Sequence, residues 1–143
     1  MVIVDSSVWI DYLNQRRTPQ TLWLGAQSGL DKAGLTTLVL AEVLQGIRHD
    51  ARFRQAEQFF RTLTVVDSYE YALAVQAASN FRTLRGLGVT IRSTVDCLIA
   101  TFCIETGQQL LHCDGDFDFF ERHLNLHVLH PPPLPAPKLE SEP

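Results

Sequence analysis

Four acidic residues occupy positions from which their carboxylates could act together. Asp5 follows the apolar run Val2–Val4, Asp114 follows a second run that ends at His112, Asp96 stands in the first turn of an expected helix, and Glu42 lies inside another. The carboxyl ends of parallel strands meet at one edge of a sheet, where sites assemble. Gathered there with bound Mg²⁺ or Mn²⁺, carboxylates can activate water and neutralise phosphate charge. That combination suits phosphodiester hydrolysis.

Each of these acids also has a purely structural explanation. Asp5 can cap the helix that follows it, and Asp96 lies three residues after Ser93, as in a capping box with a shortened acid. Glu42 can be a solvated helix carboxylate, and Asp114, close to a glycine, is an ordinary turn residue. Taken singly, none of the acids identifies a function.

The elements that must position these acids alternate along the chain between strands and helices. We expect strands at residues 2–4, 33–36, 63–66, 109–112 and 126–129. We expect helices at about residues 8–13, 19–29, 37–47, 50–60, 68–84, 95–105 and 119–123, with a turn at 114–118. This alternation predicts an α/β fold whose parallel sheet is covered by helices on both faces.

The length and composition indicate one globular domain. The chain has 143 residues, of which 45% are hydrophobic and 20% charged, which excludes a chain disordered throughout, a collagen and a disulfide scaffold. The formal charge of −4 hides a basic middle, because residues 48–92 contain seven arginines and four acids. Residues 93–143 contain two basic and eight acidic residues. Such a field can steer a polyanion to one face and collect cations at another.

The three cysteines and the chain ends indicate a cytoplasmic protein. An odd cysteine count without a CxxC motif favours reduced thiols, and Cys97 and Cys103 lie in an apolar run typical of a core. We expect no targeting segment and no membrane span. Residues 1–130 form the expected domain. Residues 131–143 hold most of the prolines and form an extended or disordered tail.

The order of four short motifs makes the acids more informative than they are singly. They are VDSSVW around Asp5, LVLAEV around Glu42, VDCLIA around Asp96, and LLHCDGDF around Asp114 and Asp116. Together they resemble the PIN-domain nucleases, and in particular the VapC-type toxins of bacterial toxin–antitoxin pairs. The resemblance covers about residues 1–130 and implies a PIN-like three-layer α/β/α fold with a central parallel sheet.

The resemblance also implies roles for individual residues. It implies catalytic roles for Asp5, Glu42, Asp96 and Asp114. The metal ligands would be Asp5, Asp96, Asp114 and Asp116, with the division of labour between the last two open. Ser6 or Ser7 matches a hydroxyl position near the metal. The implied activity is a Mg²⁺-dependent endoribonuclease, with Mn²⁺ as an alternative ion, that cleaves tRNA or rRNA and stops translation and growth.

The same resemblance implies partners. These are a VapB-type antitoxin whose C-terminal segment blocks the acidic pocket, an RNA substrate and a second copy of the chain. Arginines of the basic middle suit RNA phosphates, and we assign this role to Arg48, Arg52, Arg54 and Arg92. The alternative is that these arginines are a solvated helix face.

Two other functions remain open on the sequence. The chain could be a PIN-like nuclease of housekeeping RNA processing or DNA repair, or a non-catalytic module that binds RNA or a protein on the same fold. The four intact acids disfavour the second. Other sites are excluded, because the EF-hand pattern fails at Phe119 and Asn125, and the histidines near the C-terminus lack a cysteine pair to complete a zinc site.

Overall fold

The structure, a computed structural model, describes residues 1–66 and 69–138. Four short parallel strands form its sheet: β1 (Val2–Val4), β2 (Ala33–Thr36), β3 (Thr64–Val66) and β4 (Gln109–Leu111). Their order across the sheet is β3-β2-β1-β4, so that β1 and β4, the first and last strands along the chain, are direct neighbours. This pairing sets Val4 opposite Leu111, so the segments after β1 and β4 leave the sheet at the same edge.

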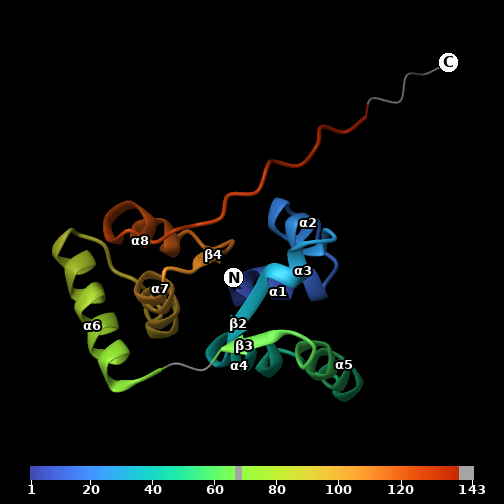
Figure 1. The fold of residues 1–143 in the computed structure, drawn as a ribbon, viewed down its shortest axis with the longest axis horizontal. Coiled ribbons are helices and arrows are strands. Elements are labelled where there is room, and N and C mark those ends of the chain that lie inside the picture. Colours follow the sequence, from blue (N-terminus) through green and yellow to red (C-terminus); the bar gives the residue numbers. More distant parts are fainter. Residues whose placement is uncertain (67–68, 139–143) are drawn as a thin grey trace.

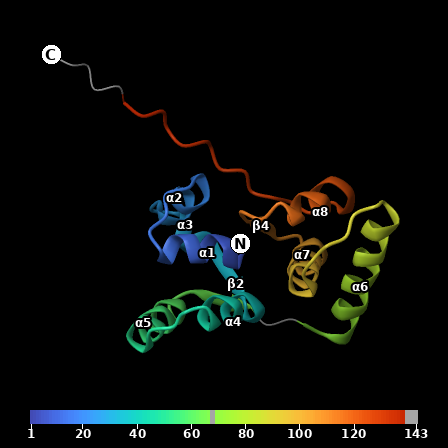
Figure 2. The same ribbon diagram turned by 180° about the vertical axis from the view of Figure 1, so that it is seen from behind.

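Helices cover the sheet on both sides (Figures 1 and 2). The helices that follow β1 and β2 are α1 (Ser6–Leu13), α2 (Pro19–Gly25), α3 (Gly29–Lys32), α4 (Thr37–Gln45) and α5 (Asp50–Phe60). Those in the second half are α6 (Tyr71–Gly86), α7 (Thr94–Thr106) and α8 (Asp116–Leu124). In both views α6, α7 and α8 lie on one side of the strands, and α1, α2, α3 and α5 on the other. This is the three-layer α/β/α arrangement predicted from the sequence.

Local sequence explains where the helices near the acids begin. Asp5, Thr36 and Ser93 are the N-caps of α1, α4 and α7, and each accepts a hydrogen bond from a backbone N–H in the first turn of its helix. Asp5 and Thr36 also end or follow buried strands, so the change from extended to helical backbone occurs at the edge of the sheet. The helices that carry Glu42 and Asp96 therefore start at fixed points.

The central strands β1 and β2 and much of α7 are buried. Val2, Ile3 and Val4 of β1 are all at most 5% exposed, as a central parallel strand requires. Cys97 and Cys103 of α7 are also buried, which confirms their expected place in the core. Trp9 is fully buried and packs edge-on against Phe60 with 5.3 Å between ring centroids. The acids thus stand on rigid elements.

Several element boundaries differ from the sequence-based expectation. Residues 126–129 form no strand, because only one bridge, between Leu110 and Val128, connects this segment to the sheet. The expected turn at 114–118 is shorter, since α8 already begins at Asp116. The helix expected at 19–29 ends earlier, because α2 stops at Gly25. A separate short helix, α3, begins at Gly29. The expected start of α6 at Ser68 lies outside the described residues.

Candidate active site

Asp5 is the buried centre of the site. Its residue is only 2% exposed, and its Oδ2 accepts hydrogen bonds from the Ser7 backbone N–H (3.1 Å) and the Ser7 hydroxyl (2.6 Å). Its Oδ1 is buried and has no hydrogen-bond partner among the described residues. Burial raises the pKa of Asp5, and the hydrogen bonds from Ser7 oppose that rise. One oxygen is thus fixed, and the other is available to a ligand.

Glu42 approaches the same place from α4. Burial raises the pKa of its carboxyl, the charge of Asp5 raises it further, and a hydrogen bond from the Ser6 side chain lowers it. Its Oε1 is buried and has no hydrogen-bond partner in the described part of the chain. The apolar pattern of the Glu42 helix did not predict that Glu42 faces inward. The structure nevertheless places it beside Asp5, because α4 packs against α1.

Asp96 faces these two acids from the first turn of α7. Its backbone N–H donates to Ser93 Oγ (3.3 Å), so the cap that the sequence predicted is formed. Its carboxylate is not used in that cap. Burial, together with the charges of Asp5, Asp114, Glu42 and Asp116 in that order, raises the pKa of Asp96 to about 7. The effect of all four acids on one carboxyl means that the five predicted site acids gather within electrostatic reach of one another.

Asp114 and Asp116 come from the segment between β4 and α8. Asp114 Oδ1 accepts a hydrogen bond from the Asp116 backbone N–H (3.0 Å), which begins the first turn of α8. Asp116 Oδ2 in turn accepts one from the Arg92 backbone N–H (3.4 Å). One oxygen of each carboxylate therefore positions the loop, and each carboxylate has a second oxygen that is not used in these two bonds.

The two serines have different partners. The Ser6 side chain hydrogen-bonds to Glu42. The Ser7 hydroxyl instead donates to Asp5 and accepts a hydrogen bond from the Cys113 backbone N–H (3.1 Å). The Asp5 backbone N–H also donates to the Leu111 carbonyl (2.9 Å). Ser7 therefore ties the end of β1 to the segment that carries Asp114. The sequence had left open which serine serves the site, and the structure uses both.

His112 is a site neighbour that the sequence analysis did not select. Its side chain is 8% exposed, its Nδ1 accepts a hydrogen bond from the Asp114 backbone N–H (3.1 Å), and its ring packs on Phe117 at 5.0 Å between centroids. Burial lowers the pKa of His112, against the charges of Asp118 and other acids. A histidine at the end of a strand, two residues before an aspartate, is too common a pattern to have indicated this contact.

The donor set suits a hard divalent cation. All five acids offer oxygen, the ligand that Mg²⁺ and Mn²⁺ prefer, and the unpartnered buried oxygens of Asp5 and Glu42 are acceptors that a cation would satisfy. The acids do not form a finished cage. Among residues 1–66 and 69–138, no group of three His, Cys, Asp or Glu side chains is already arranged to hold an ion. Like charges keep such carboxylates apart, and a cation would draw them together.

The arginines assigned to RNA lie in two different places. Arg92 adjoins the acids through its bond to Asp116. Arg48 and Arg52 instead line a groove of about 500 Å³ between α1, α4 and α5, and Arg54 is exposed on α5. RNA binding by these four residues stays a prediction.

All five acids lie within the part of the chain that matches a known family. A model of the PIN domain matches residues 2–122. The chain belongs to the PIN-domain family.

PIN-domain relatives are similar over most of both chains. The chain is 28% identical over 133 residues to "VapC ribonuclease Mb1587" of Mycobacterium bovis and to "Ribonuclease VapC11" of Mycobacterium tuberculosis, which covers 90% of this chain and 97% of each relative. The sequence-based recognition of a VapC-type PIN domain is confirmed.

Solved structures share the PIN fold. The VapBC2 structure from Rickettsia felis, bound to a promoter DNA fragment, has a TM-score of 0.70 at 19% identity, covering 90% of this chain and 98% of that one. A DNA-bound VapBC structure from Salmonella typhimurium has a TM-score of 0.71 at 16% identity, covering 90% and 96%. These likenesses establish the fold, including the central sheet with helices on both sides.

No helix in the described residues is both long and apolar enough to cross a membrane.

Proposed function

We propose that this PIN-domain protein is a metal-dependent endoribonuclease and the toxin of a toxin–antitoxin pair. The observation that carries the proposal is the convergence of Asp5, Glu42, Asp96, Asp114 and Asp116, two of which keep a buried oxygen without a partner among the described residues. The relatives named VapC ribonuclease support the activity, and the VapBC structures support a VapB-type antitoxin. Structured cellular RNA of the tRNA or rRNA class is the proposed substrate.

In this proposal, Asp5, Asp96, Asp114 and Asp116 hold Mg²⁺ or Mn²⁺. When bound, the ion supplies charge neutralisation at the phosphate and lowers the pKa of water. Asp5 contributes its free Oδ1, because Ser7 occupies Oδ2. Asp114 and Asp116 contribute the carboxylate oxygens that are not used in the two loop hydrogen bonds.

Glu42 has a different role in the proposal. Its carboxyl lies within electrostatic reach of Asp5 but comes from another element, and its Oε1 is unpartnered among the described residues. A carboxylate oxygen without a hydrogen-bond partner can accept a proton from water. We therefore assign to Glu42 Oε1 the proton that the attacking water loses as its oxygen forms a bond to phosphorus. The bond from phosphorus to the leaving oxygen breaks in the same displacement.

The first test is cleavage of RNA by the purified protein with Mg²⁺ and with EDTA. We expect Asp5→Asn and Asp96→Asn to lower the cleavage rate by at least about 100-fold while circular dichroism stays unchanged, because each loses a charged ligand. Asp50→Asn is the matched control, since Asp50 also stands in the first turn of a helix but is exposed and is not among the charges that raise the pKa of Asp96. Full activity of either site variant with saturating Mg²⁺ would contradict the assignment.

A growth assay tests the toxin role separately. Expression of the wild-type chain in a bacterium is expected to stop growth, whereas Asp5→Asn is expected to permit it, and co-expression of the antitoxin encoded beside the gene is expected to restore it. Cleavage of RNA in vitro without any effect on growth would instead favour a housekeeping RNA-processing nuclease.

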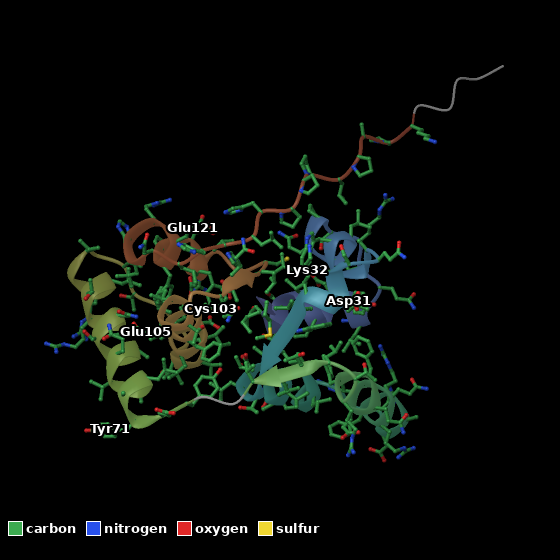
Figure 3. The ribbon with its side chains drawn as sticks, in the orientation of Figure 1. Asp31, Lys32, Tyr71, Cys103, Glu105 and Glu121 are labelled. Carbon is green, nitrogen blue, oxygen red and sulfur yellow. The ribbon has the colours of Figure 1, made fainter. Side chains whose placement is uncertain are left out.

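We also propose that the protein forms a homodimer. Exposed apolar side chains on α6 support an interface there, since Tyr71 is 87% and Val75 53% exposed, and Tyr71 projects from the outer end of the helix (Figure 3). Light scattering after size-exclusion chromatography tests this. A monomer at micromolar concentration would contradict it.

A further inference from the structure

A nuclease site built from five carboxylates repels the RNA that it must bind. Positive charge therefore has to stand beside the acids to hold the strand on each side of the cleaved phosphate. On one flank this charge is Arg92, whose backbone N–H contacts Asp116 and whose side chain is exposed. Arg48 and Arg52 do not supply the other flank, because they line the separate groove against α1 and α4.

The turn between α1 and α2 supplies the positive charge on the other flank of the acids. The Cys113 backbone N–H donates to the Ser7 hydroxyl of α1 (3.1 Å), and Cys113 immediately precedes Asp114. Asp11 lies one turn after Ser7 on the same face of α1 and forms an ion pair with Arg16 (3.6 Å). In Figures 1 and 2 the end of β4 points toward α2. The Ser7–Cys113 hydrogen bond and the Asp11–Arg16 ion pair thus place Arg16 and its neighbour Arg17 on the side of the molecule where α1 meets the segment that carries Asp114.

The turn is built rigidly. Gln15 has φ of 57°, in the left-handed region that a non-glycine residue adopts only where its surroundings fix it. The Arg16 N–H donates to the Asp11 carbonyl (2.8 Å), and the Arg16 carbonyl accepts from the Thr21 hydroxyl (2.7 Å). Thr18 then begins α2 with a capping box. These bonds hold the backbone in place while the two arginine side chains extend from it.

Both arginines are available to a ligand. The Arg16 side chain is 72% exposed, and its long ion pair with Asp11 is of the solvent-screened kind that contributes little and exchanges easily. Arg17 is exposed and has no ion pair among the described residues. Two adjacent guanidinium groups on a fixed backbone suit phosphate, which each can contact through two parallel hydrogen bonds.

A hollow of about 520 Å³ lies against this turn, between α1 and α2. Tyr12 lines it, and the Tyr12 ring is held from another side by stacking on Phe59, with 6.1 Å between centroids. Leu22, 42% exposed, lines it as well. An aromatic ring and an exposed leucine next to two arginines are the surroundings that a nucleobase and its phosphate require.

We propose that the α1–α2 turn is a nucleotide subsite of the RNA site. Arg16 and Arg17 hold phosphates of the strand on one flank of the cleaved bond, a base occupies the hollow beside Tyr12, and Arg92 holds the other flank. This rests on the proposed function. RNA is favoured over an acidic protein segment because the turn follows the helix that contacts the Asp114 segment, over which the strand must pass, and because Arg17 has no acidic partner to replace among the described residues.

The test compares RNA binding and cleavage by the Arg16→Ala/Arg17→Ala variant with those of Arg82→Ala/Arg85→Ala. The control removes the same charge from α6, on the opposite side of the sheet. For a labelled oligoribonucleotide in EDTA, two lost phosphate contacts are expected to flatten the slope of log K against log salt by about 1.4. We expect KM for cleavage to rise on the order of tenfold, with kcat little changed. The control is expected to match the wild type.

Truncation of the RNA makes the test directional. Shortening the oligonucleotide from the end that lies on the turn should remove the difference between wild type and the Arg16/Arg17 variant, and shortening from the other end should preserve it. Equal slopes and equal KM values for the two proteins would overturn the subsite. So would binding of poly-L-glutamate with the same affinity and the same dependence on Arg16 and Arg17 as RNA, because the turn would then recognise an acidic polypeptide.

The result is separable from the proposed function. If the wild type cleaves no RNA but the Arg16/Arg17 variant alone loses RNA affinity, the subsite stands and the nuclease assignment fails. If the wild type cleaves RNA and the variant binds and cleaves it equally well, the nuclease assignment stands and the subsite fails.

Discussion

Single hydrogen bonds determine how the acids of this PIN domain are presented. The Ser7 hydroxyl has one proton, and it donates that proton to Asp5 Oδ2 while its oxygen accepts the Cys113 N–H. The direction of these two hydrogen bonds makes Asp5 Oδ2 an acceptor. It leaves Oδ1, buried and without a partner among the described residues, as the atom that faces a ligand. Ser7 is thus a positioning residue for Asp5 and for the loop that carries Asp114.

Replacing Ser7 tests this positioning role. Ser7→Ala is expected to lower kcat by about 10- to 100-fold and to raise the Mg²⁺ concentration needed for half-maximal activity, because Asp5 and the Cys113 N–H lose their shared partner. Ser7→Thr keeps the hydroxyl and is expected to restore most of both values. A Ser7→Ala enzyme with wild-type kcat and wild-type Mg²⁺ response would show that the hydroxyl is merely structural.

The raised pKa values of the acids make stability depend on pH and on metal. Burial and neighbouring charges raise the pKa of Asp96 from 3.8 to about 7, so the folded protein binds a proton there that the unfolded chain has released. The contribution of Asp96 to the free energy of unfolding is therefore fully present below about pH 4 and is lost as the pH rises through 7. Asp5 and Glu42, whose pKa values are also raised, act in the same direction.

Thermal unfolding in EDTA checks this sign. We expect Asp96→Asn to be more stable than the wild type at pH 8, by about 1–2 kcal/mol after allowance for solvent screening, and the difference to vanish toward pH 4. Adding Mg²⁺ at pH 8 should raise the melting temperature of the wild type and not that of Asp96→Asn. A difference that grows toward low pH would mean that the acids do not repel one another as described.

At the scale of elements, a buried polar contact aligns α7, which carries Asp96, with α6. Asn80 of α6 is 7% exposed and donates to the fully buried Thr101 hydroxyl of α7 (3.0 Å), while Asn80 Oδ1 accepts from Gln76 (3.0 Å). Both helices bury mostly apolar residues around this pair. A single directional contact in an apolar interface fixes how the two helices are aligned.

Asn80→Ala is expected to lower the free energy of unfolding by about 1–3 kcal/mol, because it leaves the buried Thr101 hydroxyl without its partner. Urea denaturation measures this. Ser79→Ala, at an exposed position on the same helix, is the matched control and should change stability little. Equal stability of the two variants would contradict a structural role for the Asn80–Thr101 contact.

At the scale of the whole molecule, the C-terminal tail lies outside the packed body. Residues 132–138 are exposed, and the described tail runs away from the domain (Figure 1). The last side-chain contact before it is between His130 and Glu121 of α8 (2.7 Å). The expected domain of residues 1–130 is consistent with this arrangement and stays a prediction.

Removing residues 131–143 tests that boundary. The shortened chain is expected to keep its melting temperature and its rate of RNA cleavage, since residues 132–138 are exposed and none of them belongs to the hydrophobic core. Differential scanning calorimetry and the cleavage assay measure both. A clear fall in melting temperature would place part of the tail inside the domain.

Much of this molecule was predictable from local pattern. The buried strands 2–4 and 33–36 were predicted with their boundaries, because β-branched and apolar runs next to helix caps leave few alternatives. The strand at 126–129 was wrong, since pairing depends on what lies beside a segment and here only one bridge forms. Asp116 was placed in a turn, although acidic residues there favour the first turn of a helix.

The sequence by itself determined the α/β class, the family and the acids that the PIN domain brings together, because residue types and their spacing are local properties of the chain. Only the tertiary structure decided which partners each acid has. Ser7 reaches Cys113 across 106 positions, and Asn80 of α6 reaches Thr101 of α7 across 21. Such contacts depend on the order of strands in the sheet and on helix packing, which bring distant segments together. The overall charge of −4 gave no sign of the arginines from two separate segments that we propose hold the RNA.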